Sequence, residues 1–329
     1  MKFLYVHAMG INRESDDIVQ VLREAGHEAA VYNELLKKYA YLNDDVIAAV
    51  ERFIHDNDID ILISIHFIIN LALAAYRNHK KYVVLLWDAP VLEIYNPLAK
   101  MDDVYISTFD KLDRQRLLDF GAKNVMYQPL CVNAELFEGW NSEIQKTLQG
   151  NYIHDISLIG QLYDENAYDR ISHQFPMDIQ DFFDRIFEEA AFKWDGVNRI
   201  YGKTGREIIE RIKLASPDFV IPNRWELEDT EYFERTCLVH KTANIERIMV
   251  LNLLAEEYDV TLYTGSREAA EKMLHNVNIG PPVEAGKATA LVYAGSRINL
   301  NIALHGIEQG TSQRIMDVMG AGGFVLSTY

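Results

Sequence analysis

The sequence predicts an α/β protein made of two Rossmann-like domains, the second of which carries a helical insertion. Three observations lead to this class. Strand and helix patterns alternate over residues 2–130, a long run of helical patterns follows, and the alternation then returns near residue 259. Such alternation is typical of a parallel sheet covered by helices on both faces. A chain of 329 residues is also long enough for about two domains of this size.

The first half shows the alternation most clearly. Strand patterns occur at residues 2–7, 28–32, 60–66, 82–87, 103–108 and 124–127. Helical patterns occur between them at residues 12–25, 44–55, 68–78 and 111–120. No GxGxxG motif follows the first strand, so a dinucleotide site is not expected there. We expect this domain to span residues 1–138 and the polar stretch at 139–154 to be a linker.

The second half begins with a strand pattern that ends in Gly160. Helical patterns at residues 179–194, 206–214 and 227–254 then indicate an insertion at about 165–255. Further strand patterns occur at residues 259–263, 277–279, 297–304 and 324–327. We expect a second domain at 155–329 whose C-terminal part is truncated, because the helix that should cover the last strand does not follow it.

The segment after the strand pattern at 297–304 has the order of parts that a phosphate-bearing ligand needs. A polar turn leads to Gly310, and Thr311 and Ser312 are candidate caps of a helix that contains Arg314 in its first turn. Free N–H groups and the positive dipole end of such a helix favour an anion at the carboxyl edge of an open α/β sheet. A phosphate site is therefore expected at 310–314.

Other polar residues and glycines accompany this segment. Asp317 lies one turn inside the helix, where its carboxylate could take two ribose hydroxyls. Asn299 and Asn301 share one face of the strand and form either a polar network near the ligand or partners for buried backbone groups. Gly322 and Gly323 let the backbone turn into the last strand, and they could serve only to end the helix.

This last stretch closely resembles the C-terminal motif of the glycosyltransferases similar to spore maturation protein CgeB, which have the GT-B fold. The matching residues are Ser296, Ile298, Asn299, Leu300, Asn301, Ile302, Gly310, Arg314, Asp317 and the turn at 320–324. The resemblance extends over nearly the whole chain, through segments at 86–90, 127–133, 155–160, 245–247 and 262–264 and through Lys241.

The resemblance implies a nucleotide-diphosphate sugar as the donor. An acidic residue on the corresponding helix of GT-B transferases holds the donor ribose, and Asp317 is in that place. Those relatives often carry a second acid eight residues earlier, where this chain has Gln309. Many GT-B enzymes stabilise the departing diphosphate with cationic side chains and helix ends rather than a metal. The resemblance therefore implies no metal cofactor.

Three cations are candidates for that diphosphate contact, namely Lys241, Arg247 and Arg314. Lys241 and Arg247 could equally belong to an exposed helix face, and Arg314 could be an ordinary surface arginine. Gly160 joins this set because the strand that it ends is similar to the first strand of a GT-B donor domain.

A base that activates the acceptor hydroxyl would be needed in an inverting reaction. His7, His66 and Asp88 all lie at the carboxyl ends of strand patterns in the first domain. A structural role as hydrogen-bonded histidines, or as a turn cap for Asp88, is the alternative for each.

Composition limits the partners. The net charge of -17 and the pI near 5.0 oppose a large basic surface for nucleic acid. Two distant cysteines and the lack of a long apolar segment indicate a cytoplasmic protein without a disulfide framework or transmembrane segment. The oligomeric state is not indicated by the sequence.

The leading interpretation is a glycosyltransferase that moves a sugar from a nucleotide-diphosphate sugar to an unknown acceptor, which could be a glycan, a glycoprotein or a small molecule. Two alternatives stay open. One is a nucleotide-sugar epimerase or phosphorylase, since these also use paired Rossmann-like halves. The other is a catalytically silent module that binds a sugar nucleotide.

Overall fold

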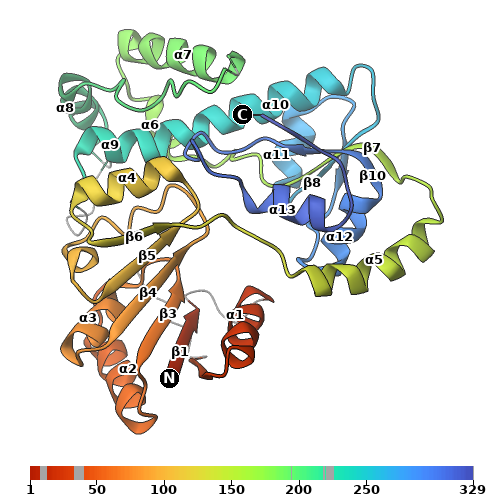
Figure 1. Cartoon of the computed structure of the whole chain (residues 1–329). Helices are drawn as coiled ribbons and strands as arrows, with labels where there is room; N and C mark the ends of the chain where they lie inside the picture. The colour runs from red at the N-terminus through yellow and green to blue at the C-terminus, as the bar shows by residue number, and fades with distance from the viewer. Residues whose placement is uncertain (8–12, 33–40, 194, 218, 220–225, 329) are drawn as a thin grey trace. The chain divides into compact units, whose positions relative to one another are not determined.

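The computed structural model describes residues 1–7, 13–32, 41–193, 195–217, 219 and 226–328 of the chain (Figure 1). The side chains of residues 7 and 13–16 lie outside this description. The chain divides into two compact units, Met1–Leu130 with Pro222–Glu226, and Cys131–Ile221 with Leu227–Tyr329. Each unit is built around one parallel sheet.

The first unit contains a six-stranded parallel sheet in the order β2-β1-β3-β4-β5-β6. Its strands are β1 (Lys2–His7), β2 (Glu28–Tyr32), β3 (Ile61–Ile65), β4 (Lys81–Leu86), β5 (Val104–Thr108) and β6 (Asn124–Tyr127). Its helices are α1 (Arg13–Glu24), α2 (Asp44–Asp56), α3 (Ile69–Arg77), the 3₁₀ helix η1 (Pro97–Lys100) and α4 (Lys111–Phe120). This is the alternation that the sequence predicts for residues 2–130.

Local sequence signals explain where these elements begin and end. The side chain of Asn43 caps α2 by accepting a hydrogen bond from the backbone N–H of Val46, and Asp110 caps α4 in the same way. Gly121 ends α4 with φ 106°, a left-handed conformation that favours glycine. Strands β1 and β3 are buried, because helices cover both faces of a parallel sheet.

The second unit contains a five-stranded parallel sheet in the order β11-β10-β7-β8-β9. Its strands are β7 (His154–Ile159), β8 (Val260–Tyr263), β9 (Asn278–Gly280), β10 (Ser296–Asn301) and β11 (Val325–Ser327). The strand expected at residues 297–304 thus ends at Asn301, and the three residues after it belong to a loop. Helices α11 (Arg267–Met273), α12 (Lys287–Ala294) and α13 (Gln313–Gly320) connect the strands.

The structure corrects the expected linker at residues 139–154. Residues 134–148 form helix α5 (Ala134–Leu148), which belongs to the second unit. Its apolar residues Phe137, Ile144 and Leu148 are buried against Tyr293 of α12 and Val318 of α13. Only a few of its residues are apolar, so the stretch reads as polar although one stripe of it is buried.

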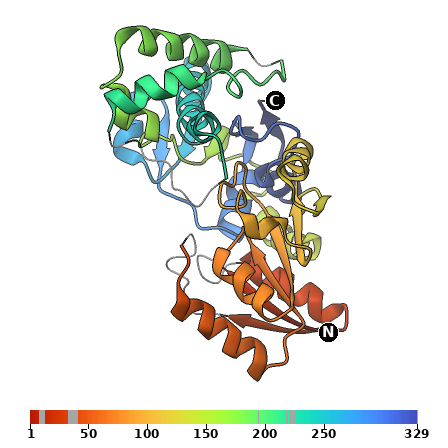
Figure 2. The same ribbon diagram turned by 90° about the vertical axis from the view of Figure 1, so that its left-hand side faces the viewer.

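The helical insertion follows β7, as the sequence predicts. It comprises α6 (Ala167–Ser172), α7 (Met177–Phe192), α8 (Arg206–Ala215), α9 (Asp229–Phe233), the π-helical segment η2 (Glu234–Leu238) and α10 (Val239–Leu254). Tyr168, Phe175, Phe183, Phe187 and Phe233 form its aromatic core. Figure 2 shows α10 nearly end-on with the green helices of the insertion beside it. The insertion therefore has a hydrophobic core of its own.

Two polar contacts fix loops around this insertion. The buried carboxylate of Glu234 accepts hydrogen bonds from the backbone N–H groups of Gly202, Lys203 and Thr204. Glu226 belongs to the first unit, and its N–H donates to the carbonyl of Tyr95 in that unit at 2.7 Å.

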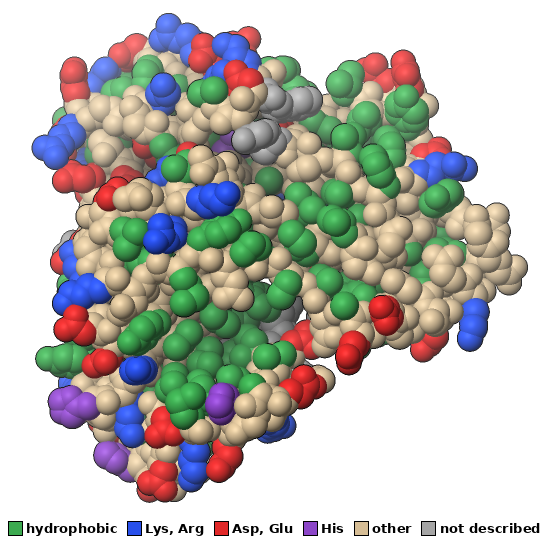
Figure 3. Space-filling model, viewed as in Figure 1, with side chains coloured by type: hydrophobic (Ala, Val, Ile, Leu, Met, Phe, Trp, Pro, Cys, Tyr) green, Lys and Arg blue, Asp and Glu red, His purple; other side chains and the backbone are tan. Residues whose placement is uncertain are grey.

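The surface shows dispersed charge. On the face drawn in Figure 3, Lys and Arg side chains are scattered among Asp and Glu, and the described residues form no continuous basic area there. Within the described ranges, no helix is both long and apolar enough to cross a membrane.

Candidate functional site

Two arginines converge on Gly160 at the carboxyl edge of the second sheet. Gly160 follows β7, Arg247 lies on α10, and Arg314 lies in the first turn of α13. A Cβ atom built on Gly160 would lie 3.2 Å from Nη2 of Arg314 and 3.3 Å from Nη1 of Arg247. Glycine at this position therefore lets both guanidinium groups approach the strand end.

Arg314 is held by oxygens at the ends of two strands. Its Nη1 donates to Oδ1 of Asn301 at 3.0 Å, and its Nη2 donates to the carbonyl of Ile159 at 2.9 Å. A cation in the first turn of a helix opposes the helix dipole. These two hydrogen bonds give the physical reason for an arginine there.

Arg247 is almost fully buried, with 3% of its surface exposed. Its Nη1 donates to the carbonyl of Gln161 at 2.5 Å and its Nη2 to the carbonyl of Ile302 at 2.7 Å. Its guanidinium carbon lies 4.7 Å from the centre of the Tyr163 ring. Burial and, to a smaller extent, the nearby charge of Arg314 lower the pKa of Arg247 to about 10, so the side chain stays charged at neutral pH.

The hydrogen bonds of this arginine pair all go to neutral oxygens. Carbonyl and amide oxygens orient the two guanidinium groups without cancelling their charges. Nε of Arg247 is buried and has no hydrogen-bond partner among the described residues. Because two fixed like charges attract an anion more strongly than one, this arrangement favours a doubly charged ligand such as a diphosphate.

The amino end of α13 lies beside this pair and differs in one respect from the expectation. Ser312 is the residue before the helix, but its hydroxyl donates to Oδ1 of Asn301 at 3.0 Å. Ser312 is thus the N-cap residue, as expected, but its hydroxyl is turned toward Asn301 and does not accept from the helix amides. No side chain among the described residues caps the helix, so its first amides stay available for a ligand.

Other residues of the predicted phosphate segment lie around this helix end. Gln309, Gly310 and Thr311 belong to the loop between β10 and α13. Asp317 lies one turn inside α13, half-buried, and its Oδ1 accepts a hydrogen bond from Nε2 of Gln313 at 3.0 Å. The carboxylate is therefore oriented on the helix face where the sequence reasoning placed the ribose contact.

Three residues that were candidates for donor binding have a structural role. Asn299 is buried, accepts from Oγ of Ser157 and donates to the carbonyls of Tyr293 and Phe324. Gly322 has φ 74° directly after α13. A Cβ on Gly323 would lie 2.6 Å from the carbonyl of Tyr293. These residues end the helix and pack it against the sheet.

Lys241 is not brought to the arginine pair. Its ammonium forms an ion pair with Asp169 of α6 at 2.9 Å, and the side chain is mostly covered. The lysine therefore joins two helices of the insertion.

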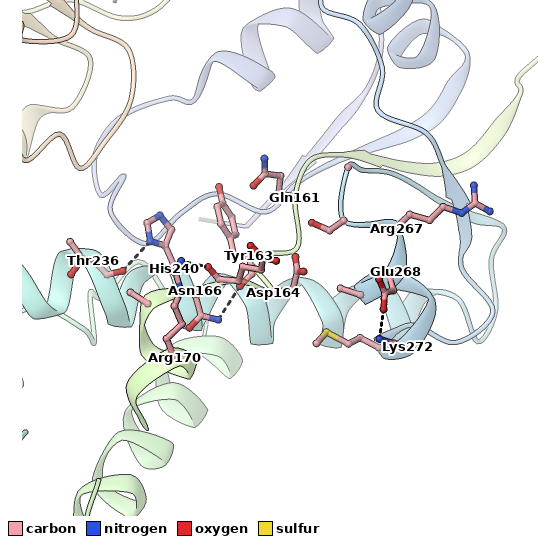
Figure 4. A pocket seen from close by; sticks show the side chains of 16 residues that line it. Gln161, Tyr163, Asp164, Asn166, Arg170, Thr236, His240, Arg267, Glu268 and Lys272 are labelled. Carbon is pink, nitrogen blue, oxygen red and sulfur yellow. Dashed lines mark hydrogen bonds and ion pairs between the residues drawn. The ribbon is translucent and has the colours of Figure 1, made fainter. Parts of the chain in front are cut away.

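A cavity of about 990 Å³ opens next to Arg247, and the sequence reasoning missed it (Figure 4). Gln161 and Tyr163 after β7 form one side, and Ser266, Arg267 and Glu268 after β8 form the other. Applying the strand-end rule to β8 as well as β7 would have identified it. The ring of His240 lies beside that of Tyr163, with 5.1 Å between their centres.

A second polar pair was also missed by the sequence reasoning. Nε2 of His305, in the loop between β10 and α13, lies 3.2 Å from Oε2 of Glu246 on α10. The carbonyl of His305 accepts a hydrogen bond from Asn198. Both contacts attach this loop to the helical insertion.

The first unit carries a histidine–aspartate pair at the carboxyl edge of its own sheet. Nε2 of His66, just after β3, lies 3.2 Å from Oδ2 of Asp88, just after β4. The hydrogen bond from His66 lowers the pKa of Asp88 below its ordinary value. His66 has φ 62°, a left-handed conformation that is uncommon for histidine and that concentrates at functional sites.

The three acid–base candidates therefore differ in what the structure shows of their contacts. His66 and Asp88 meet, and 80% of the Asp88 side chain is exposed, so a substrate could reach its carboxylate. The second ring nitrogen of His66, Nδ1, is buried without a hydrogen-bond partner among the described residues. His7 ends β1, and its side chain lies outside the described residues. Among the described residues, no group of three or more His, Cys, Asp or Glu is placed to hold a metal ion.

Comparison with known proteins identifies the fold. No family model matches the sequence, and a search of curated proteins gives no significant match. Among solved structures, a glycosyltransferase from Rickettsia africae is 11% identical with a TM-score of 0.50, covering 99% of this chain and 78% of that one. Sucrose-phosphate synthase from Thermosynechococcus elongatus is 8% identical with a TM-score of 0.52, covering 99% and 81%.

These likenesses confirm the fold class expected from the sequence. The two parallel sheets are of the Rossmann type and match the GT-B fold of glycosyltransferases. Identities this low establish the fold alone.

Proposed function

We propose that this protein is a glycosyltransferase that moves a sugar from a nucleotide-diphosphate sugar to an acceptor hydroxyl. The observation that carries the proposal is the convergence of Arg247 and Arg314 on Gly160, beside the uncapped amino end of α13. Two oriented charges and free amides at the carboxyl edge of a parallel sheet suit a diphosphate. The fold supports the proposal, because the two solved structures described above are a glycosyltransferase and a sucrose-phosphate synthase.

The two arginines would stabilise the leaving diphosphate, Arg314 by direct contact and the buried Arg247 through its charge. As the bond between sugar and diphosphate breaks, negative charge grows on the departing phosphate oxygen. Guanidinium groups that are already fixed by Ile159, Gln161 and Ile302 need no reorganisation to receive it. In this proposal the arginines replace a bound metal.

The other donor contact in the proposal is Asp317. Its carboxylate would accept hydrogen bonds from two ribose hydroxyls while Gln313 holds its Oδ1. Asn301 would act through Arg314 and Ser312, whose donors it accepts.

His66 and Asp88 are the proposed acceptor-activating pair. The exposed carboxylate of Asp88 would take the proton of the acceptor hydroxyl, and the imidazole of His66, which contacts that carboxylate through Nε2, would hold it in place. We place the reaction in the cytoplasm and the chain among the CgeB-like transferases, on the strength of the motifs in its sequence.

Calorimetric titration with uridine, guanosine and thymidine diphosphates and their sugars tests the donor site. We expect one nucleotide series to bind, and Asp317→Ala to weaken its affinity by about tenfold, as for a lost hydrogen bond to a charged group. Asp184→Ala, which removes an exposed carboxylate on α7, is the matched control. Absence of binding by every series would reject the proposal.

A further inference from the structure

The arginine pair and the cavity occupy neighbouring positions along one sheet edge. The arginines hold carbonyls that follow β7 and β10, and the cavity is lined by residues that follow β7 and β8. Helix α13, with Asp317, follows β10. Because the sheet order is β11-β10-β7-β8-β9, the sequence of sites along the edge is α13, arginine pair, cavity. A group attached to a diphosphate at the arginines, on the side away from α13, would enter the cavity.

The charges that line the cavity are balanced. The cationic residues are Arg170, Arg267 and Lys272, and the acidic residues are Asp164, Glu165 and Glu268. Lys272 and Glu268 already form an ion pair at 2.6 Å. The remaining polar lining consists mainly of amides and hydroxyls, from Gln161, Asn166, Tyr163, Thr236 and Ser266. The lining therefore offers many donors and acceptors without a net charge.

This balance selects against an anionic occupant. A carboxylate in this cavity would need a cation whose charge is not already balanced, and each cation that lines the cavity has an acidic counterpart among the lining residues. The whole chain carries a net charge of -17, which adds to the repulsion. An uncharged ligand needs no compensating cation and is not repelled by the negative net charge of the chain. If it carries many hydroxyls, the amides, hydroxyls and charged groups of the lining can form hydrogen bonds with it.

The aromatic wall of the cavity is tied to the arginine pair. Tyr163 has φ 56°, an uncommon conformation for a bulky residue. Its ring contacts both the Arg247 guanidinium and the His240 ring. Figure 4 shows Tyr163 and His240 together on the side of the cavity opposite Arg267 and Glu268. The same tyrosine thus contacts the phosphate-binding arginine and forms the cavity wall, so both ends of a sugar diphosphate would meet one rigid unit.

We propose that the cavity receives the sugar of the donor, and that this sugar is uncharged, a hexose or N-acetylhexosamine rather than a uronic or sialic acid. The proposal rests on the proposed function, because it takes a diphosphate at Arg247 and Arg314 as its starting point.

Calorimetry on the full chain tests this selectivity with UDP, UDP-glucose and UDP-glucuronate, and with GDP, GDP-mannose and GDP-mannuronate. For the nucleotide series that binds, we expect the hexose ester to bind about tenfold more tightly than the uronate, the effect of roughly one charge-assisted contact. Asp164→Asn and Glu268→Gln each give the cavity a net positive charge. Each should reduce that preference to about threefold or less without weakening the free diphosphate.

Glu188→Gln is the matched control, since it removes an exposed carboxylate on α7 that does not line the cavity. It should leave the preference unchanged. Equal binding of hexose and uronate esters by the unmodified chain, or a preference that the two cavity variants leave intact, would overturn the inference while the diphosphate site stands. Failure of every diphosphate to bind would instead overturn the proposed function, and the inference with it.

Discussion

The carboxyl edges of the two sheets carry different chemistry. In the first unit, His66 and Asp88 form a solvent-accessible pair that can exchange a proton. In the second unit, Arg247 and Arg314 are fixed by neutral oxygens, and Arg247 stays charged at neutral pH. Parallel strands bring side chains together at the same edge in both units, and the side chains then decide the chemistry. In the proposed function, the first edge transfers the proton and the second binds the anion.

The largest expected effect comes from breaking the acid–base pair at the first edge. His66→Asn keeps a residue that tolerates the left-handed backbone at φ 62° but removes the imidazole that holds Asp88 in place. We expect the rate of donor turnover, measured as release of nucleoside diphosphate, to fall by about 10²–10⁴-fold with unchanged donor affinity.

His79→Asn is the matched control for that substitution. His79 also has a positive φ, at 53°, and it is exposed in the loop after α3. If the turnover rate falls equally in both variants, the fall is caused by replacing a histidine at a left-handed position and not by losing the His66 imidazole.

Donor affinity should fall sharply when the second edge loses a charge. Arg314→Ala removes two hydrogen bonds that orient the guanidinium and one of the two fixed charges. We expect nucleoside diphosphates to bind about 10–100-fold more weakly by calorimetry, with a smaller dependence on salt. Arg297→Ala, on the exposed face of β10, should leave binding unchanged. If the Arg314 variant and the unmodified chain bind nucleoside diphosphates equally well, Arg314 does not bind the anion, and the role assigned to the second edge is wrong.

A smaller effect is expected from crowding the arginines. In Gly160→Ala the new methyl group would meet both guanidinium groups at 3.2–3.3 Å, so they must shift. Overpacking of this kind costs about 1–3 kcal/mol, which corresponds to about tenfold weaker diphosphate binding if roughly half of it falls on the bound state. Gly205→Ala has open space around its Cβ and serves as the control. If both alanine variants bind equally well, Gly160 is not needed for the approach of the arginines.

The smallest effect concerns stability at the first edge. The pKa of Asp88 is lowered in the folded chain, so its contribution is fully present above the unfolded pKa of about 4 and is lost as the pH falls through the folded value. Because the carboxylate is largely exposed, the contribution is less than about 1 kcal/mol. Urea unfolding at pH 7 and pH 3 should show a smaller acid loss for Asp88→Asn than for the unmodified chain. Identical losses would mean that the pair with His66 adds nothing to stability.

Much of this molecule could be predicted from local patterns. The strands β2 and β6 and the helix α4 have the bounds that the sequence indicates. The rule that ligands bind at the carboxyl ends of parallel strands also selected His66 and Asp88, and the resemblance of β7 to the first strand of a GT-B donor domain selected Gly160. Helix α5 was missed because its buried stripe is short and its other residues are polar, as in a linker.

Side-chain partners were less predictable. The sequence placed Arg247 and Arg314 among the candidates, yet 67 positions separate them along the chain, and only the packing of α10 and α13 against β7 and β10 brings both to Gly160. The ion pair of Lys241 with Asp169 and the bond of Ser312 to Asn301 had no signal in spacing or composition. Such contacts depend on which of several possible partners the folded chain brings nearest.

The sequence by itself determined the two α/β halves, the insertion and the strand ends where polar residues gather, because hydrophobic periodicity and turn residues act over short distances along the chain. Only the tertiary structure decided which polar residues meet. It joined His66 to Asp88, set Arg247 beside Arg314 and opened a charge-balanced cavity next to them. The physical reason is that hydrogen bonds and charges act over a few ångströms in space, a distance that only the packed chain fixes.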